Sequence, residues 1–267
     1  MLFSESPNNL TEYQPLPLYF SMQRLLPFLT LILLLFSCQP SRPDKQSASA
    51  AVETESPEQK EKRILSWEKA IRQLEARDSL EQDPDHAILF IGSSSVRLWK
   101  NIEEDMAPYP TIRRGYGGAR FSDFAHYTER LVYPHQPRAI CVFVANDIAG
   151  TSIDVSPKEA FGYWNEVYQT IRRQYSDLPV FYIGITPTSS RWAFWDEIQV
   201  FNNLVHQQAK KDGNLYYIHT FPAFMNAATQ QPDSSLFTSD QLHLNAAGYD
   251  RWAAVIKESL DKNLPPL

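Results

Sequence analysis

The sequence predicts an α/β protein with a mainly parallel sheet and helices on both of its faces. Three apolar runs, at 87–91, 139–144 and 179–185, are continuous rather than alternating, which is typical of strands buried on both faces. Segments with the three- and four-residue periodicity of amphipathic helices lie between these runs. Because strands and helices alternate, the strands are expected to lie parallel in one sheet. With 267 residues, 43% of them hydrophobic, the chain can bury the core of one domain with appendages.

The segment before this domain has the pattern of a secretory signal. Residues 25–36 are almost wholly apolar, a basic residue precedes them, and small or polar residues follow. A membrane-spanning helix needs about 20 apolar residues, so this shorter run fits the core of a signal peptide better. Met22 stands at the usual distance before such a core. The expected signal is therefore 22–37 within 1–37, and the true start, Met1 or Met22, stays open.

The sequence L-F-S-C, which ends at Cys38, resembles the lipobox of bacterial lipoproteins. The resemblance implies cleavage before Cys38, lipidation of its thiol, and secretion across the bacterial inner membrane to an anchored position on the periplasmic or cell-surface side. A signal cut elsewhere, or an unprocessed anchor, is the alternative. Residues 38–58 are rich in Pro, Ser, Ala and charge, so a disordered tether that spans about 25 Å is expected there. The domain itself is predicted over 59–267.

The first element of the domain is an amphipathic helix from 59 to about 77. Its apolar residues recur at three- and four-residue spacing and are Ile64, Trp67, Ile71 and Leu74. The sequence D-P-D at 83–85 breaks this helix before the first strand begins. We therefore expect the helix to lie on the domain ahead of the sheet.

The strand at 87–91 stops at Gly92, and three serines follow it. Glycine can turn the chain without a Cβ clash, and the next residues have the pattern of the first turns of a helix. A serine at this junction lies at the carboxyl end of a sheet, close to backbone N–H groups that can receive negative charge. This setting suits a nucleophile, although serines after a strand serve more often as helix caps. The G-x-S-x-G elbow is not matched, since Val96 stands at its second glycine.

The remaining elements follow from the same two patterns. They are, in order, a short helix at 98–106, a strand at 111–114, a helix at 121–132, a strand at 139–144, a helix from 156 to about 175, a strand at 179–185, a helix with an apolar stripe over 192–205, a strand at 214–219 and a closing helix. Pro108 and Pro110 end the first of these helices. Ser156, Pro157 and Glu159 form a capping box that opens the long one.

Three residues stand just after predicted strands: Ser94, Gly118 and Asn146. In a parallel sheet, ligands collect at the carboxyl ends of the strands, so these positions are candidates for a site. The sequence G-Y-G-G at 115–118 marks backbone with positive φ or a close approach, but it matches neither phosphate-loop pattern. An ordinary turn is the alternative for Asn146 and Asp147.

Asp240 and His243 stand three residues apart, just before the closing helix. At this spacing both side chains can face the same side of one turn. The carboxylate can then hold the Nδ1 proton of the imidazole and leave Nε2 free as a base, which is what a serine nucleophile needs. A surface aspartate beside a histidine that caps the following helix is the alternative.

Composition argues against several other classes of protein. The net charge is −6 and no basic stripe occurs, so no nucleic-acid partner is expected. Cys38 and Cys141 are far apart and form no disulfide framework, and Cys141 lies in an apolar run that suits the core. Because no H-E-x-x-H sequence or carboxylate cluster accompanies the aspartate and histidine pair, no metal site is expected either.

Four short blocks together resemble the SGNH, or GDSL-type, hydrolases: G-S-S-S from Gly92, R-G-Y-G-G from Arg114, A-N-D from Ala145 and D-Q-L-H from Asp240. Their order and spacing match that family from about 67 to 260, most closely its acylhydrolase-like members with G-S-S-S in place of G-D-S-L. The resemblance implies a flavodoxin-like α/β/α sandwich with a five-stranded sheet.

The resemblance also implies the roles of individual residues. Ser94 matches the nucleophile, His243 the general base, and Asp240 the residue that orients the base. Ser94, Gly118 and Asn146 match the oxyanion-hole donors. One departure is Val144, which stands where the family usually has glycine, next to the loop that carries the asparagine.

The expected activity is hydrolysis of short-chain esters, with carbohydrate acetyl esters among the expected substrates and no metal or organic cofactor. Arg191, Trp192 and Trp195 are candidate substrate contacts, since indole and guanidinium groups suit sugars, although aromatic residues on a helix lie more often in the core. A lysophospholipase or acyl-thioesterase is the alternative among enzymes. A catalytically silent glycan-binding module is the alternative from another class, and the intact serine, histidine and aspartate argue against it.

Overall fold

The computed structural model describes residues 55–266 of the chain. The predicted signal at 1–37, the lipidation of Cys38 and most of the predicted tether therefore lie outside the described residues. Within the described part, no helix is long and apolar enough to cross a membrane.

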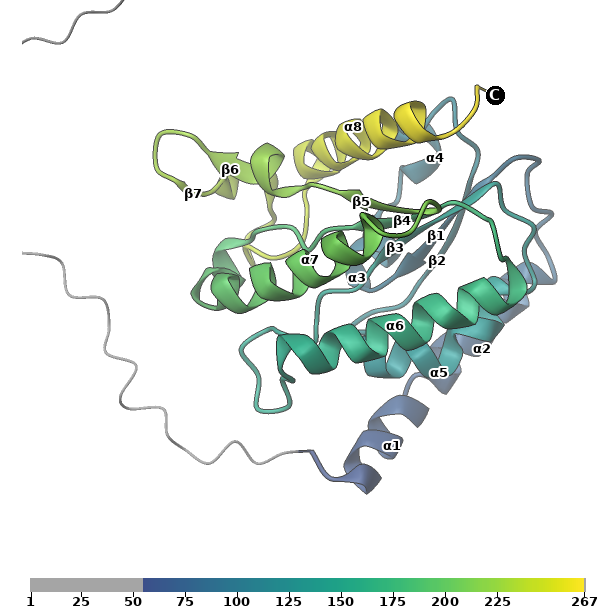
Figure 1. Cartoon of the computed structure of the whole chain (residues 1–267), viewed down its shortest axis with the longest axis horizontal. Coiled ribbons are helices and arrows are strands. Elements are labelled where there is room, and N and C mark those ends of the chain that lie inside the picture. The colour runs from purple at the N-terminus through teal and green to yellow at the C-terminus, as the bar shows by residue number, and fades with distance from the viewer. Residues whose placement is uncertain (1–54, 267) are drawn as a thin grey trace, which may run out of the picture. The chain divides into compact units, whose positions relative to one another are not determined.

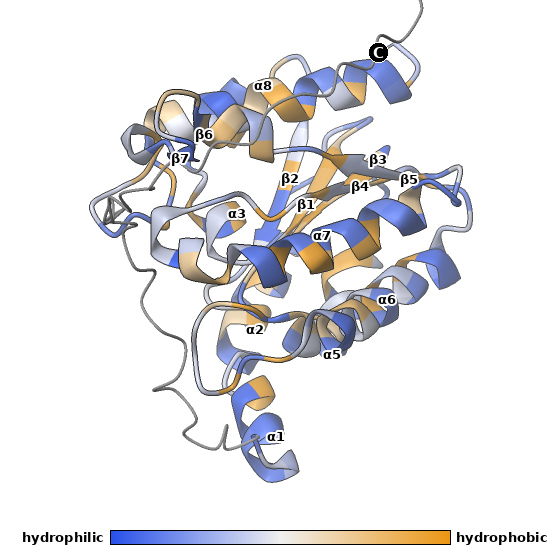
Figure 2. Cartoon of the chain, turned by 60° about the vertical axis from the view of Figure 1, so that its left-hand side comes forward, coloured by the Kyte–Doolittle hydropathy of each residue, from blue (hydrophilic) through white to orange (hydrophobic). Residues whose placement is uncertain are grey.

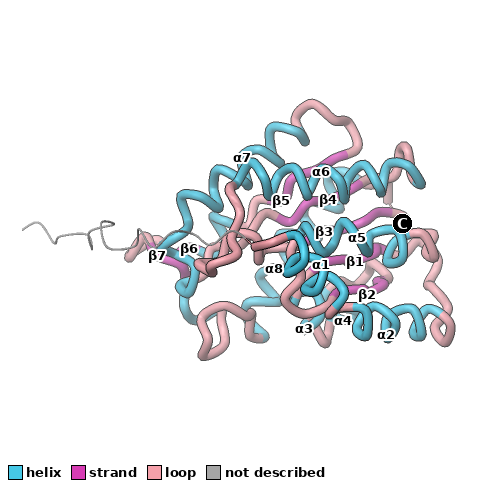
Figure 3. Tube along the Cα trace, turned by 90° about the horizontal axis from the view of Figure 1, so that it is seen from below, coloured by secondary structure: helices cyan, strands magenta, loops and turns pink. Residues whose placement is uncertain are grey.

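The centre of the domain is a five-stranded sheet in which every neighbouring pair of strands is parallel. Its spatial order is β2-β1-β3-β4-β5, which Figure 3 shows from one edge to the other. The strands are β1 (Ile88–Gly92), β2 (Thr111–Gly115), β3 (Ala139–Phe143), β4 (Val180–Ile183) and β5 (Leu215–Ile218). This is the flavodoxin-like strand order, so the predicted fold class is confirmed.

Helices cover both faces of the sheet, and Figure 1 shows α4 and α8 on one side and α2, α5 and α6 on the other. The helices are α1 (Pro57–Leu65), α2 (Glu68–Asp78), α3 (Ser94–Leu98), α4 (Ile102–Asp105), α5 (Phe121–Val132), α6 (Pro157–Gln174), α7 (Trp195–Ala209) and α8 (Ala246–Asn263). Short 3₁₀ turns, η2 (Ser189–Phe194), η3 (Phe221–Phe224) and η4 (Ser234–Leu236), join some of them. The result is the expected three-layer sandwich.

The core lies where the two helical layers meet the sheet. Every residue of β1 and of β3 is buried, which explains why their sequences are continuous apolar runs. Figure 2 shows these strands as hydrophobic ribbons between helices whose outer faces are hydrophilic. A sheet buried in this way is a rigid platform for the loops at its carboxyl edge.

The predicted helix at 59–77 is wrong in one respect, because the structure has two helices there. The break falls at Ser66 and Trp67, where the Ser66 hydroxyl donates a hydrogen bond to the Arg63 carbonyl. The Trp67 indole packs on the Tyr116 ring, with 5.4 Å between the centroids. The helix also begins within the predicted tether, at Pro57, since Ser56 forms a capping box with the third helical residue.

Three other segments differ from their predictions. The short helix predicted at 98–106 is replaced by α3 and α4, which are separated at Trp99 because its buried ring packs against Phe90 in the core. The helix predicted over 192–205 begins as the 3₁₀ turn η2 and becomes α-helical at Trp195. A small hairpin of β6 (Met225–Asn226) and β7 (Gln231–Pro232) was not predicted, since two-residue strands leave no periodicity to read.

Candidate active site

The turn after β1 is built by one glycine. Gly92 has a φ of +151°, and a Cβ atom there would lie 2.0 Å from the carbonyl oxygen of Phe143 on the neighbouring strand. No other residue fits this contact. The Ser93 N–H donates to the same carbonyl at 2.9 Å, and helix α3 begins at Ser94. The chain therefore leaves the sheet sharply and places Ser94 at its carboxyl edge.

The Ser94 hydroxyl lies next to an imidazole from a distant part of the chain. The distance between Ser94 Oγ and His243 Nε2 is 3.0 Å, across 149 residues of sequence. The residue at the N-cap position of α3 is Ser93, and its side chain makes no capping hydrogen bond. Helix α8 is capped by Asn245 rather than by His243. Both capping alternatives raised by the sequence are thus excluded.

The other ring nitrogen of His243 is held by Asp240, with 2.6 Å between Nδ1 and Oδ2. The second carboxylate oxygen, Oδ1, accepts hydrogen bonds from the N–H groups of Leu242 and His243, both at 2.9 Å. It also accepts one from the Thr238 hydroxyl at 2.8 Å. The carboxylate and the imidazole are therefore fixed by contacts within a single turn, 238–243.

These hydrogen bonds determine the charge of Asp240. Burial favours the neutral carboxyl, but the bonds from His243, Leu242 and Thr238 outweigh it and hold the pKa of Asp240 well below its usual range. An ionised carboxylate can only accept, so the proton on the His243 ring is assigned to Nδ1. Nε2 is then free to accept the proton of the Ser94 hydroxyl.

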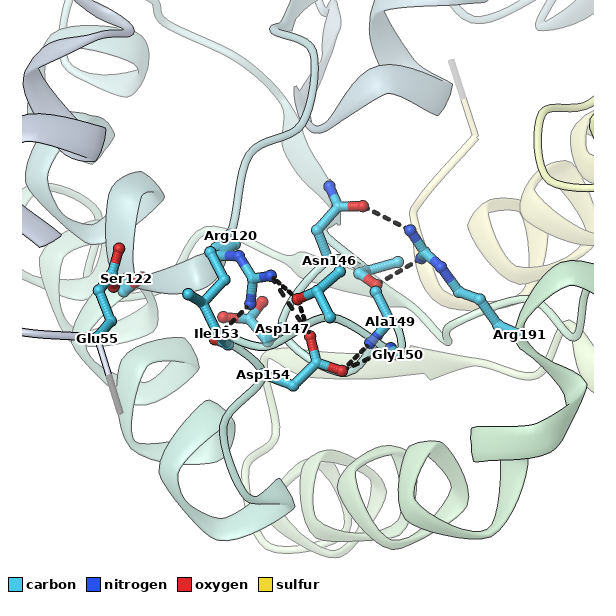
Figure 4. A network of polar contacts seen from close by, with 12 residues as sticks. Glu55, Arg120, Ser122, Asn146, Asp147, Ala149, Gly150, Ile153, Asp154 and Arg191 are labelled. Atoms are coloured by element: carbon cyan, nitrogen blue, oxygen red, sulfur yellow. Dashed lines mark hydrogen bonds and ion pairs between the residues drawn. The ribbon is translucent and has the colours of Figure 1, made fainter. Parts of the chain in front are cut away.

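Asn146 follows β3, and both ends of its amide have partners. Its Nδ2 donates to the Ala119 carbonyl at 2.8 Å. Its Oδ1 accepts a hydrogen bond from Arg191 Nη2 at 2.6 Å, while Arg191 Nη1 donates to the Ala145 carbonyl at 2.5 Å. Figure 4 shows the Arg191 side chain reaching Asn146. The sequence predicted Arg191 as a substrate contact; the structure places it in the lining of the pocket beside Ser94, with two of its N–H groups bound to Ala145 and Asn146, so the contact stays a prediction.

The loop after Asn146 is fixed by two carboxylates. Asp147 is buried and accepts the Phe121 N–H at the start of α5, at 2.9 and 3.1 Å. Asp154 accepts the N–H groups of Ala149 and Gly150 at 2.6 Å each. The Arg120 guanidinium lies 3.4 Å from Asp154 and closes the network drawn in Figure 4.

The burial of Asp147 has an electrostatic consequence. Burial raises the pKa of Asp147 to about 6, although the Phe121 N–H and the charges of Arg120 and Arg63 act in the opposite direction. The group is thus poised to gain a proton in mildly acidic solution. Its role in the structure is to tie the loop that carries Asn146 to helix α5.

Gly118 is an exposed residue of the otherwise largely buried loop between β2 and α5, and it has a φ of +72°. A Cβ atom there would lie 3.1 Å from the Trp67 ring, so glycine is favoured on two grounds. Gly118 directly precedes Ala119, the residue whose carbonyl accepts from Asn146. The structure therefore joins the two loops that carry the predicted donors, although Gly118 itself does not line the pocket beside Ser94.

A small pocket of about 20 Å³ opens beside the Ser94 hydroxyl. Its polar and charged residues include Ser94, Asn146, Arg191 and His243. Its apolar wall is formed by Phe143, Ala145, Phe237, Leu242, Leu244 and Trp252. The Trp252 indole is itself fixed by a hydrogen bond to the Thr186 hydroxyl at 3.0 Å. A space of this size accommodates about one water molecule or one methyl group.

The two tryptophans predicted to contact substrate lie elsewhere. Trp195 is 5% exposed and is stacked between Trp192 and Phe221, with ring centroids 5.7 and 5.4 Å away. Trp192 is partly buried, and neither indole lines the pocket beside Ser94. The prediction for Trp195 is therefore corrected, because its rings serve the packing of α7 and have no free face.

Sequence reasoning missed several residues of the site. Thr238 could have been found, since a hydroxyl two residues before an aspartate is a common local hydrogen-bonding pattern. The contributions of Ala119, Thr186 and Trp252 depend on contacts between distant elements and leave no local signal. Among residues 55–266, no group of three or more His, Cys, Asp or Glu side chains is arranged to hold a metal ion.

The strand order and the two helical layers define a flavodoxin-like α/β sandwich. Within this class, the chain belongs to the GDSL-like Lipase/Acylhydrolase family, whose model matches residues 92–251. None of the curated proteins compared with the chain matches it.

Solved structures share the fold at low sequence identity. A Streptococcus pneumonia protein, provisionally described as a platelet activating factor, is 23% identical with a TM-score of 0.64, over 75% of this chain and 95% of its own. A GDSL-like lipase from Bacteroides thetaiotaomicron is 18% identical with a TM-score of 0.61, over 73% and 98%. A catalytic mutant of an acetylxylan esterase from Geobacillus stearothermophilus is 13% identical with a TM-score of 0.55, over 67% and 95%. At these identities the likeness establishes the fold alone.

Proposed function

We propose that the protein is a serine ester hydrolase that cleaves short-chain carboxylic esters. The observation that carries this proposal is the continuous hydrogen-bonded chain from Asp240 through His243 to Ser94, with distances of 2.6 and 3.0 Å. A hydroxyl is a weak nucleophile until a base takes its proton, and the base needs a fixed orientation to do so. The chain supplies both conditions at the mouth of a pocket.

In the proposed mechanism, Ser94 Oγ attacks the ester carbonyl carbon while His243 Nε2 takes the hydroxyl proton. Asp240 stabilises the resulting imidazolium through Nδ1. The tetrahedral intermediate collapses when His243 returns the proton to the leaving alcohol, which yields an acyl-enzyme. Water, activated by the same imidazole, then attacks the acyl carbon and releases the acid.

The negative charge of the tetrahedral oxygen requires donors that are already in place. We assign this role to the backbone N–H groups of Ser94 and Gly118 and to the side-chain amide of Asn146. One hydrogen of Asn146 Nδ2 is used by the Ala119 carbonyl, so the other is available for the oxyanion.

The small pocket supports a short acyl group such as acetyl. Phe143 and Trp252 are large, buried side chains in its wall, and a long acyl chain would have to displace them. This observation disfavours a lysophospholipase or a long-chain acyl-thioesterase. The likeness to an acetylxylan esterase supports acetyl esters of carbohydrates as the substrate class. The catalytically silent glycan-binding module is disfavoured, since binding alone requires no base beside a serine.

A fluorophosphonate probe tests the nucleophile. The wild-type protein is expected to be labelled at one serine, and Ser94→Ala is expected to lose both labelling and hydrolysis of an aryl acetate. Ser95→Ala is a matched control, since it removes a neighbouring hydroxyl and should keep labelling. Unlabelled, folded wild-type protein would favour the binding module.

A chain-length series tests the acyl preference. We expect kcat/KM for aryl esters to fall from acetyl to octanoyl, and acetylated xylo-oligosaccharides to be cleaved in preference to lysophospholipid. Replacing Trp252 by alanine should enlarge the pocket and raise the relative rate for butyryl esters. A wild-type preference for octanoyl esters would contradict the proposal. The lipid anchor at Cys38 stays a prediction, which mass analysis of the membrane-extracted protein would test.

A further inference from the structure

We propose that Arg191 is a positioning residue that fixes the orientation of the Asn146 side-chain amide. This inference rests on the proposed function, in which the amide donates to the oxyanion. It assigns Arg191 a role in transition-state stabilisation that is exerted through the Asn146 amide. The evidence is the pattern of donors and acceptors around the amide, and Figure 4 shows the contact on the Arg191 side.

An asparagine amide is nearly symmetrical in shape, so a rotation of 180° exchanges its donor and acceptor ends with little steric cost. After such a rotation, Asn146 would present a carbonyl oxygen where the amide N–H now lies. An oxygen at that place would repel an oxyanion. The catalytic value of Asn146 therefore depends on what holds the amide in one of its two orientations.

Two partners of opposite character hold it. The Ala119 carbonyl can only accept a hydrogen bond, and it lies 2.8 Å from Nδ2. The Arg191 guanidinium can only donate, and its Nη2 lies 2.6 Å from Oδ1. In the rotated state both contacts would become unfavourable, since an oxygen would face a carbonyl and an NH₂ group would face a cation.

The fork shape of the guanidinium suits this task. Nη1 donates to the Ala145 carbonyl at 2.5 Å while Nη2 donates to the Asn146 side chain, so one planar group binds two consecutive residues. Burial lowers the pKa of Arg191 to about 10, which still leaves it protonated at neutral pH. A lysine carries the charge but not the fork, and it could not make both bonds in the same geometry.

The backbone next to Arg191 also contacts the turn 238–243, which carries Asp240 and His243. The neighbouring Ser190 N–H donates to the Gln241 carbonyl at 3.2 Å, between Asp240 and His243. The Arg191 N–H donates to the Thr188 carbonyl at 3.2 Å within η2. The guanidinium is thus presented from a segment that is anchored independently of the loop it supports.

The first experiment measures kcat and KM of Arg191→Ala and Arg191→Lys on an aryl acetate. Both variants are expected to lose about 10- to 100-fold in kcat, with KM changed less than about 2-fold, because the oxyanion contact forms in the transition state. Arg72→Ala is the control: it removes an arginine whose side chain is 74% exposed and should leave both constants unchanged. Circular dichroism and thermal unfolding establish that each variant is folded.

A double-mutant cycle with Asn146→Ala separates positioning from other roles. Asn146→Ala alone is expected to lose about 10²- to 10³-fold in kcat. If Arg191 acts through Asn146, Arg191→Ala should cause less than about a 2-fold further loss in that background. Multiplicative losses in the double variant would overturn the proposal, as would a rise in KM at constant kcat, which indicates a substrate contact. Full activity of Arg191→Lys would exclude the fork-specific role.

The cycle also distinguishes this proposal from the function on which it rests. If Asn146→Ala keeps full kcat while Ser94→Ala is inactive, the serine mechanism stands but the amide is not a donor, and the proposal for Arg191 is overturned with it. If Ser94→Ala remains active, the proposed function itself fails. If Asn146→Ala loses kcat but the losses of Asn146→Ala and Arg191→Ala multiply in the double variant, only the positioning role of Arg191 is refuted.

Discussion

The two halves of the candidate site are held in different ways. The imidazole half is a local structure, because Asp240 holds His243 through contacts made within one turn, and the Asp240 side chain is 48% exposed. The amide half is assembled from distant parts of the chain. Asn146 depends on Ala119, 27 residues away, and on Arg191, 45 residues away.

This difference predicts how substitutions in each half affect activity and stability. A local turn can preserve the geometry of the aspartate and the histidine by its own contacts. The imidazole half should therefore tolerate substitutions in the residues around it. The amide half depends on the buried Asp147, the partly buried Asp154, the Arg191 guanidinium and the packing of α5, so distant substitutions can disturb it. We expect substitutions in the imidazole half to lower kcat alone. Substitutions in the amide half should lower both kcat and the free energy of unfolding.

The largest effect is expected for Asp240→Asn. The amide cannot accept and stabilise a charge as the carboxylate does, and it favours the wrong tautomer of His243, so kcat should fall about 10⁴-fold. Because the side chain is half exposed, the midpoint of urea unfolding should hardly move. Asp250→Asn, an exposed aspartate on α8, is the control. A strongly lowered midpoint in Asp240→Asn would show that the turn is not independent of the fold.

Asn146→Ala is expected to have the next largest effect, a loss of about 10²- to 10³-fold in kcat. Unlike Asp240→Asn, it also removes contacts to Ala119 and Arg191, so the free energy of unfolding should fall by about 1 to 2 kcal/mol. Steady-state kinetics and urea titration measure the two effects. Asn203→Ala, on the exposed face of α7, serves as the control. Unchanged stability would contradict the distinction between the two halves.

Asp154→Ala tests the framework of the amide half without touching the site. It removes the acceptor of the Ala149 and Gly150 N–H groups and leaves the buried Arg120 side chain without its carboxylate. The free energy of unfolding should fall by about 3 kcal/mol, and kcat should fall about 10-fold as the loop loosens. Glu166→Ala, which removes an exposed carboxylate on α6, should have little effect in either assay. If Asp154→Ala is destabilised but keeps the wild-type kcat, the rigidity of this loop does not contribute to catalysis.

The smallest effect on catalysis is expected at Asp147, whose titration makes the stability depend on pH. Its raised pKa, about 6, means that the folded protein binds a proton more tightly than the unfolded chain does. Its contribution therefore raises the free energy of unfolding as pH falls from 7 to 4, by about 2 to 3 kcal/mol. Asp147→Asn removes this term, so the stability difference between wild type and variant should grow in favour of wild type on acidification. A difference that stays constant with pH would contradict the raised pKa.

The sequence was sufficient for the fold and for the local half of the site. Continuous apolar runs predicted the buried strands, and the spacing of Asp240 and His243 predicted a shared turn, because both signals lie within a few residues. It could not assign Arg191 its partner, since nothing in S-S-R-W indicates that the guanidinium reaches the loop after β3. Nor could it show that Trp195 is enclosed, because an apolar stripe and a sugar-binding face have the same composition.

The short turn η2 has a consequence for how this protein can vary. Ser190 contacts the segment that carries the imidazole, and Arg191 contacts the loop that carries the amide, so one turn sets the separation between the His243 ring and the Asn146 side chain. A residue inserted between Ser190 and Arg191 would change the separation of these two contacts and so displace the imidazole relative to the amide.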